Sequence, residues 1–91
     1  MFEKSVKVIN RLGMHARPSA MFVTHAARFT SEVFIEKDGL KVNGKSIMGV
    51  MMLAAEKGTT LIISAEGEDE QSAVNDLIEL VSSGFGELKN L

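Results

Sequence analysis

The stretch Leu12-Gly13-Met14-His15-Ala16-Arg17-Pro18-Ser19 separates a strand-like N-terminus from a segment with helical periodicity. Apolar residues recur with the spacing of one helix face over residues 16–27, which predicts an amphipathic helix. Pro18, the only proline, fits the first turn of that helix, where N–H groups have no intrahelical partner. The pattern therefore places His15 at or beside a helix N-terminus, where free N–H groups and the positive end of the helix dipole meet.

Turn signals divide the rest of the chain. Asp38-Gly39 favours a two-residue type I′ hairpin, in which both central residues have positive φ. Asn43-Gly44 predicts a second turn, the hydroxyl of Ser46 is suited to cap a helix, and Lys57-Gly58 is expected to end that helix. The expected strands are Phe2–Ile9, Glu32–Lys37, Leu40–Val42 and Thr59–Ala65; the expected helices are 16–27, Ile47–Glu56 and a last helix after Glu68-Asp69-Glu70, beyond which Ser82–Leu91 is expected to fray.

The predicted element order is β-α-β-β-α-β-α. This order indicates the α+β class, an open-faced β-sandwich in which three helices cover one face of a four-stranded, mostly antiparallel sheet. A chain of 91 residues, 45% of them hydrophobic, can build one core, so residues 1–91 are expected to form a single domain.

Composition argues against several classes of protein. The chain has no cysteine, so disulfides and cysteine-based metal sites are excluded, and it shows no secretory signal, which suits a cytoplasmic protein. The longest apolar run, Ile47–Ala55, is far shorter than the roughly 20 residues that span a bilayer. Residues 1–45 hold eight Lys/Arg and four Asp/Glu, whereas residues 46–91 hold two and eight. Because the basic residues are spread over strands and turns, we expect neither a nucleic-acid partner nor a membrane partner.

The residues around His15 are suited to phosphoryl chemistry. A neutral imidazole is a nucleophile whose ring nitrogen can be phosphorylated. The N–H groups of Ala16 and Arg17 can donate to phosphoryl oxygens, and the Arg17 guanidinium can neutralise their charge. The residues alone leave two interpretations open, a reversible phosphoryl carrier and a plain helix-cap histidine beside a surface arginine.

Two motifs resemble one known family. Gly13-Met14-His15-Ala16-Arg17-Pro18 resembles the active-site signature of the HPr family, the histidine-containing phosphocarrier proteins of the bacterial phosphotransferase system (PTS). Lys45-Ser46-Ile47-Met48-Gly49-Val50-Met51 resembles the serine-centred segment of the same family. The separation of the motifs and the tail Glu66-Gly67-Glu68-Asp69-Glu70 also fit, so the resemblance covers essentially the whole chain. One departure is Met14, where the family usually has a leucine of similar volume.

The resemblance implies a phosphocarrier rather than an enzyme. Enzyme I would phosphorylate His15 as a pros-phosphohistidine, Arg17 would stabilise the phosphate, and enzyme IIA domains of sugar transporters would accept it. Ser46 would be a regulatory phosphorylation site, the position where many relatives are regulated by an HPr kinase/phosphorylase. The resemblance also implies a cytoplasmic protein, and we expect a monomer with neither a cofactor nor a metal.

An apolar surface is expected beside His15. Val50 and Leu53 can fill the buried stripe of the second helix, so its methionines are left either for core filling or for an adaptable docking surface. The predicted docking residues are Met14, Ala16, Ala20, Thr24, Ile47, Met48, Met51 and Met52.

Other functions are also compatible with the sequence. Ser46–Ala55 and Ser83-Gly84-Phe85 also resemble the nitrogen-related branch of the family, whose role is regulatory rather than in sugar transport. A small binding module with an incidental histidine is a third hypothesis. His25 lies ten positions after His15, about 15 Å of helical rise, which is too far for the two to share a metal ion. We expect His25 and Lys45 to be solvated.

Overall fold

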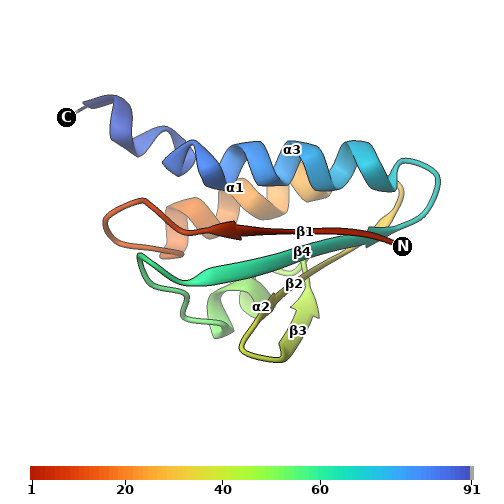
Figure 1. Ribbon diagram of the computed structural model, residues 1–91, viewed down its shortest axis with the longest axis horizontal. Coiled ribbons are helices and arrows are strands. Elements are labelled where there is room, and N and C mark those ends of the chain that lie inside the picture. The colour runs from red at the N-terminus through yellow and green to blue at the C-terminus, as the bar shows by residue number, and fades with distance from the viewer. Residues whose placement is uncertain (91) are drawn as a thin grey trace.

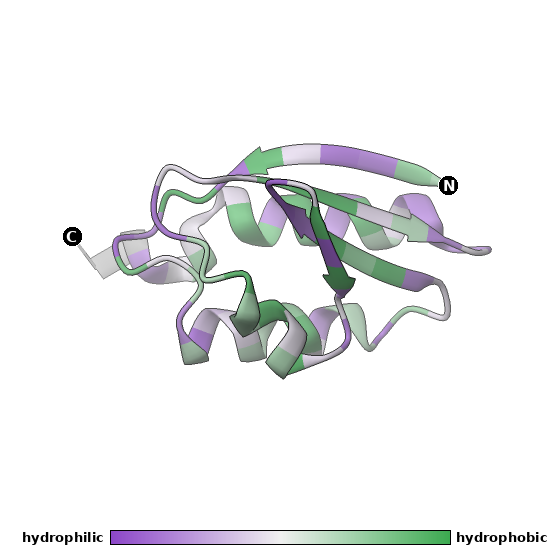
Figure 2. Cartoon of the chain, turned by 90° about the horizontal axis from the view of Figure 1, so that it is seen from below, coloured by the Kyte–Doolittle hydropathy of each residue, from purple (hydrophilic) through white to green (hydrophobic). Residues whose placement is uncertain are grey.

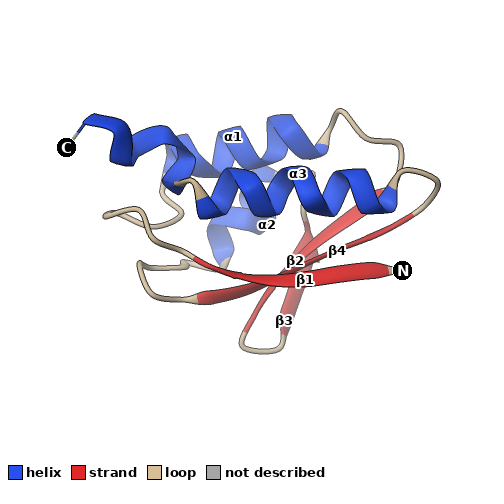
Figure 3. Cartoon of the chain, turned by 45° about the horizontal axis from the view of Figure 1, so that its top comes forward, coloured by secondary structure: helices blue, strands red, loops and turns tan. Residues whose placement is uncertain are grey.

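One antiparallel sheet and three helices on a single face of it form the protein (Figure 3). The structure, a computed structural model, describes the backbone of residues 1–90 and the side chains of residues 1–87. The elements are β1 (Phe2–Lys7), α1 (Ala16–Ala26), β2 (Glu32–Lys37), β3 (Leu40–Asn43), α2 (Ile47–Met52), β4 (Thr60–Glu66), α3 (Glu70–Ser82) and a 3-10 segment, Gly84–Asn90. The predicted α+β class and element order are therefore confirmed.

The sheet has the strand order β1-β4-β2-β3, and every neighbouring pair is antiparallel. β4 lies centrally, with Leu61 opposite Val6 on β1 and Ile63 opposite Ile35 on β2. The β2–β3 connection is the predicted hairpin: Asp38 and Gly39 have φ values of 50° and 85°, both positive as a type I′ turn requires. Local turn chemistry thus fixes the register of this hairpin.

The core fills the space between the sheet and the helices. α3 contacts β1, β4 and β2, whereas α1 packs against α2 and α3 (Figure 1). Alternate residues of the strands enter this layer, together with one stripe from each helix. Its largest fully buried side chains are Phe22, Phe85, Ile35, Leu61, Ile63 and Leu77.

The second helix is shorter than predicted. It ends at Met52 rather than at Glu56, and Ala54 has a positive φ of 48°. Leu53 and Ala55 are both buried. Residues two apart point to different sides of a helix, so burying both requires the chain to leave the helix first. The glycine that was expected to end the helix, Gly58, instead lies in the next turn, where its N–H donates to the carbonyl of Val8 (2.7 Å).

Residues 84–87 are packed on the fold, contrary to the fraying expected from Ser82 to Leu91, and the side chains after Glu87 lie outside the described residues. After α3, two short 3-10 turns span Gly84–Asn90 with a kink at Phe85 and Gly86, and Leu91 lies outside the described residues. Phe85 is fully buried, so burial of one aromatic side chain opposes the fraying. This segment lies at the same end of the molecule as the loop before α1 (Figure 1).

Candidate functional site

The loop before α1 is held by a closed set of hydrogen bonds. The N–H of Gly13 donates to the carbonyl of Asn10 (3.2 Å), and the Asn10 side-chain amide donates back to the carbonyl of Gly13 (2.8 Å). Gly13 has a φ of +66°, and a Cβ there would lie 2.3 Å from the carbonyl oxygen of Ala55. Only glycine meets both conditions, which explains this residue two positions before His15.

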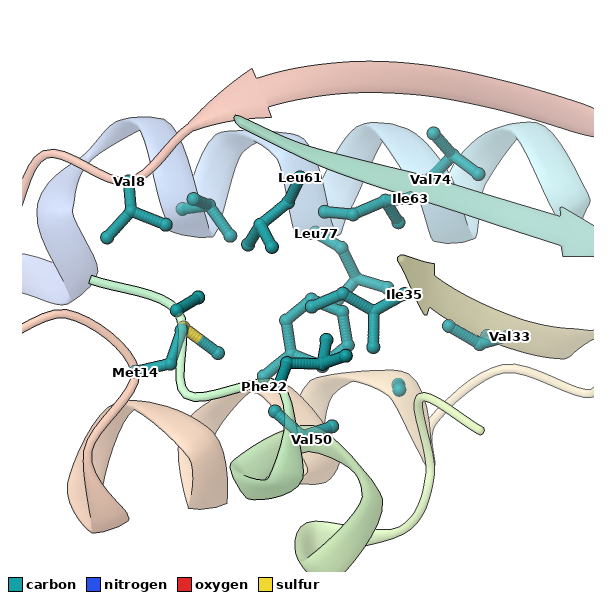
Figure 4. Packing of buried hydrophobic residues seen from close by; sticks show 14 of the residues in the cluster. Val8, Met14, Phe22, Val33, Ile35, Val50, Leu61, Ile63, Val74 and Leu77 are labelled. Atoms are coloured by element: carbon teal, nitrogen blue, oxygen red, sulfur yellow. The ribbon is translucent and has the colours of Figure 1, made fainter. Parts of the chain in front are cut away.

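Met14 is a core residue, so the prediction that it lies on the docking surface is wrong. Its side chain is only 4% exposed and lies in the same cluster as Phe22 and Val50 (Figure 4). Its N–H donates to the carbonyl of Ala55 (2.8 Å), and its carbonyl accepts from the buried hydroxyl of Ser19 (3.0 Å). These contacts turn the side chain inward and fix the backbone immediately before His15.

His15 is the N-cap residue of α1, as predicted. Its carbonyl accepts the first helical hydrogen bond, from the N–H of Ser19 (3.0 Å), but its imidazole does not cap the helix. The first-turn N–H groups of Ala16 and Arg17 therefore have no acceptor within the helix. The side chains of His15 and Arg17 are 36% and 57% exposed, so an approaching protein can reach both. The geometry provides a nucleophilic imidazole, a guanidinium and free backbone donors at one surface position.

Glu87 is a further member of the site, and no sequence pattern had predicted it. One carboxylate oxygen, Oε2, lies 3.3 Å from Nε2 of His15 and 3.2 Å from Nη1 of Arg17. The other, Oε1, lies 3.4 Å from the side-chain amide nitrogen of Asn10. The buried Phe85, two positions earlier, anchors the segment that carries Glu87. An aromatic residue between two glycines near the C-terminus was the available signal that this tail packs on the fold.

Ser46 is the N-cap of α2, and its hydroxyl accepts a hydrogen bond from the N–H of Gly49 (3.2 Å). The predicted cap is thus confirmed. The side chain is partly exposed. Its phosphorylation stays a prediction.

The apolar residues of α2 form an exposed surface, which we call the methionine surface: Ile47, Met48, Met51 and Met52 are 40%, 75%, 43% and 70% exposed. Val50 and Leu53 are buried, so the helix is anchored without the methionines. In Figure 2 most of α2 is coloured hydrophobic. Of the predicted docking residues on the adjacent α1, Ala16, Ala20 and Thr24 are all exposed. All predicted docking residues except Met14 are therefore exposed, and docking at them stays a prediction.

Two residues expected to be solvated have protein partners. Nδ1 of His25 lies 2.8 Å from the carboxylate of Asp76, and this contact connects α1 to α3. Nζ of Lys45 donates to the carbonyl of Phe29 (2.7 Å). Both partners come from distant parts of the chain, so helix periodicity alone could not reveal them.

Within residues 1–90, the structure contains no helix that is both long enough and apolar enough to span a membrane. The helix that carries the exposed apolar residues, α2, is six residues long.

Comparison with known proteins identifies the family. Residues 2–83 match the family model described as the PTS HPr component phosphorylation site. The chain is 56% identical over 81 residues to the HPr-like protein Crh of Halalkalibacterium halodurans, covering 89% of this chain and 96% of that one. It is 48% identical over 87 residues to the phosphocarrier protein HPr of Neisseria meningitidis, covering 96% and 98%.

A solved structure gives the same assignment. The HPr of Thermoanaerobacter tengcongensis superposes with a TM-score of 0.92 at 47% identity, covering 96% of this chain and 98% of that one. The HPr of that organism has also been solved as a dimer, with a TM-score of 0.77. A match over nearly the whole chain, by sequence and by structure, shows that this protein belongs to the HPr family of the phosphotransferase system.

Proposed function

We propose that this protein accepts a phosphoryl group from enzyme I on His15 and donates it to enzyme IIA domains, as a carrier in phosphoenolpyruvate-dependent sugar uptake. The observation that carries the proposal is the uncapped start of α1, where a partly exposed imidazole lies beside Arg17 and unpaired first-turn N–H groups. A helix start of this kind favours a bound anion.

The chemistry requires little more than this arrangement. Phosphoryl transfer between proteins depends on in-line positioning and charge stabilisation. Nδ1 of His15 is the accepting nitrogen in this proposal, and Arg17 offsets the negative charge of the phosphoryl oxygens. Because hydrogen bonds from backbone N–H groups and from the Asn10 side chain hold the loop that carries His15, the position of the imidazole is fixed.

The methionine surface is the proposed docking site for both partners. Methionine side chains are flexible and can adapt to unrelated surfaces, which suits a carrier that meets a donor and several acceptors. Exchange between partners also requires that this surface stay free, so we propose that the carrier acts as a cytoplasmic monomer. A solution mass twice that of the chain under assay conditions would contradict this part of the proposal.

Ser46 is proposed as a regulatory phosphorylation site beside the docking surface. A phosphate there would add negative charge next to Ile47 and Met48 and would hinder docking of enzyme I. A Ser46→Asp variant should accept phosphate from enzyme I more slowly than wild type, with Ser46→Ala as the matched control. Equal rates in all three proteins would contradict the regulatory role.

A second candidate function is purely regulatory, with phosphorylation gating partners outside sugar transport. The observation that favours it is the 56% identity to an HPr-like protein Crh. A regulatory branch of the family, such as the nitrogen-related one, would use the same phosphohistidine chemistry. The two functions differ in whether a sugar-specific enzyme IIA domain accepts the phosphoryl group.

The test of phosphoryl acceptance uses purified enzyme I and phosphoenolpyruvate with wild type, His15→Ala and His25→Ala. Wild type and His25→Ala should gain one acid-labile, base-stable phosphate, and His15→Ala should gain none. Labelling of His15→Ala, or no labelling of wild type by enzyme I from either branch of the family, would contradict the proposal. His25 is the suitable control because it lies on the same helix as Arg17 but pairs with Asp76.

A further inference from the structure

The contacts of Glu87 bear on which nitrogen of His15 reacts. Its carboxylate is 22% exposed and approaches Nε2, not Nδ1, at 3.3 Å. An ionised carboxylate can only accept hydrogen bonds, so the ring nitrogen that faces it must carry the proton. A neutral imidazole has one N–H and one lone pair. The lone pair is then on Nδ1.

We infer that Glu87 is a positioning residue for His15: by accepting the Nε2 proton it holds the imidazole in the tautomer that leaves Nδ1 free as the nucleophile. This inference rests on the proposed function and adds to it a residue that determines the reactive nitrogen. In the opposite tautomer, the Nε2 lone pair would face the carboxylate oxygen at 3.3 Å, and the two would repel.

The carboxylate is itself held in place. Oε1 accepts from the side-chain amide of the fully buried Asn10 at 3.4 Å, and Oε2 accepts from Arg17 at 3.2 Å. The buried Phe85 fixes the preceding backbone. Asn10 also donates to the carbonyl of Gly13, so one buried amide connects the loop that carries His15 with the carboxylate that orients its ring. Orientation of a histidine by a carboxylate at its second nitrogen is a general way to fix its tautomer.

The transfer step balances with this assignment. The Nδ1 lone pair forms the new N–P bond, while the bond from phosphorus to the donor atom of enzyme I breaks and its electron pair stays on that atom. No proton leaves Nδ1, because the ring proton is on Nε2. The ring gains positive charge as the bond forms, and the carboxylate of Glu87 lies where it offsets that charge. Arg17 is free to turn from Glu87 to the phosphoryl oxygens.

The second histidine provides an internal comparison. In His25 it is Nδ1 that lies 2.8 Å from a carboxylate, that of Asp76. The two histidines should therefore have opposite tautomers, with the proton on Nε2 in His15 and on Nδ1 in His25. A single spectrum of one protein reports both.

The first test is the ¹⁵N chemical shifts of the imidazole nitrogens at a pH where the rings are neutral. In wild type we expect the Nε2–H form for His15 and the Nδ1–H form for His25. Glu87→Ala should move His15 toward a mixture of tautomers and leave His25 unchanged, while Glu87→Asp should restore part of the preference. Glu66→Ala, which removes an exposed carboxylate from the far end of β4, is the control for charge. An Nδ1–H form of His15 in wild type would overturn the inference, and so would the same ratio of His15 tautomers in wild type and Glu87→Ala.

The second test is the rate of phosphoryl acceptance from enzyme I. Glu87→Ala should lower kcat roughly two- to fivefold with little change in KM, the size expected of a partly exposed charge pair. An unchanged kcat in Glu87→Ala would overturn the role of Glu87 in transfer. If wild type accepts no phosphate at all, the proposed function fails, whereas normal transfer with an unchanged tautomer overturns only the role of Glu87.

Discussion

The starts of α1 and α2 have different N-caps. At α2 the hydroxyl of Ser46 accepts from the N–H of Gly49, so the cap stabilises its own helix. At α1 the cap position holds His15, whose imidazole turns away from the helix toward Glu87. Serine is among the best capping residues, and histidine is not among them. The start of α1 therefore lacks the stabilising side-chain cap of α2 but keeps backbone donors and a nucleophile available for a ligand.

The largest expected effect comes from giving α1 the cap that it lacks. His15→Asn should abolish phosphoryl acceptance and still raise the free energy of unfolding by roughly 0.5 kcal/mol. A good cap contributes about 1 kcal/mol, and loss of the partly exposed contact to Glu87 offsets part of it. Chemical denaturation and phosphoryl transfer from enzyme I measure the two quantities. A variant that is clearly less stable than wild type would show that His15 has a structural role at the helix start.

The next effect concerns the guanidinium beside the uncapped helix. Arg17→Ala should lower kcat for phosphoryl acceptance by about tenfold with a smaller change in KM, because it removes a donor to charge that develops during transfer. Arg28→Ala, another exposed arginine in the residues just after α1, is the matched control. Steady-state kinetics with enzyme I as the varied substrate separate the two constants. Equal kcat values in wild type and Arg17→Ala would remove Arg17 from the proposed site.

Substitution in the methionine surface should change KM and not kcat, the opposite of Arg17→Ala. Met48→Asp should raise KM for enzyme I by roughly fivefold and leave kcat nearly unchanged, because it places a charge in an apolar contact. The control is Leu40→Asp, since Leu40 is 50% exposed at the β2–β3 hairpin, outside the methionine surface. If both variants raised KM equally, the added negative charge alone would explain the effect, and docking of enzyme I on α2 would be contradicted.

Removing the cap of α2 should affect stability without affecting transfer. Ser46→Ala should lower the free energy of unfolding by about 1 kcal/mol, the usual cost of losing a serine cap. The rate of phosphoryl acceptance by His15 should match wild type. Thermal unfolding and the transfer assay test the two halves of this prediction, and a slower transfer in Ser46→Ala would mean that the two helix starts are coupled.

The N-cap of α3 gives the smallest effect, which is confined to acid pH. Asp69 does not cap its own helix; the side-chain hydroxyl of Ser31 and the backbone N–H groups of Thr30 and Ser31 donate to its carboxylate. The Ser31 hydroxyl, followed by the Thr30 N–H, lowers the pKa of Asp69 from 3.8 to about 2. Because the pKa of Asp69 is lower in the folded protein than in the unfolded chain, its carboxylate stabilises the fold at pH values above 3.8. This stability is lost as the pH falls from 3.8 toward about 2.

The measurement is unfolding as a function of pH in wild type, Asp69→Asn and Glu68→Gln. In Asp69→Asn the free energy of unfolding should depend less on pH between 3.8 and about 2. Glu68→Gln, at the exposed neighbouring position, should keep the wild-type dependence. Identical slopes in wild type and Asp69→Asn would contradict the assignment to Asp69.

The features that the sequence predicted correctly depend on short segments. The start of α1 follows from Pro18 and the apolar spacing after it, and the hairpin follows from two residues with positive φ, Asp38 and Gly39. The Ser46 cap spans three positions. In each case the interactions that determine the feature lie within the same short segment of the chain, so local sequence preferences are sufficient to predict it.

The features that were missed depend on partners distant in the chain. Glu87 is 72 positions from His15, and nothing local shows that a kink after Phe85 returns the carboxylate to the helix start. The inward orientation of Met14 depends on the carbonyl of Ala55, and that carbonyl is available only because α2 ends early. Sequence reasoning therefore located the nucleophile and its arginine but not the residue that orients the ring.

Onward transfer of the phosphoryl group in a single turnover tests the carrier function of His15. The protein is phosphorylated with enzyme I and labelled phosphoenolpyruvate, freed of both, and mixed with a sugar-specific enzyme IIA domain. We predict that the label leaves His15 and appears on the acceptor domain in equal amount, with Arg17→Ala slower than wild type. Label that stays on His15 with every sugar-specific acceptor domain tested would contradict the carrier function and would favour the regulatory one.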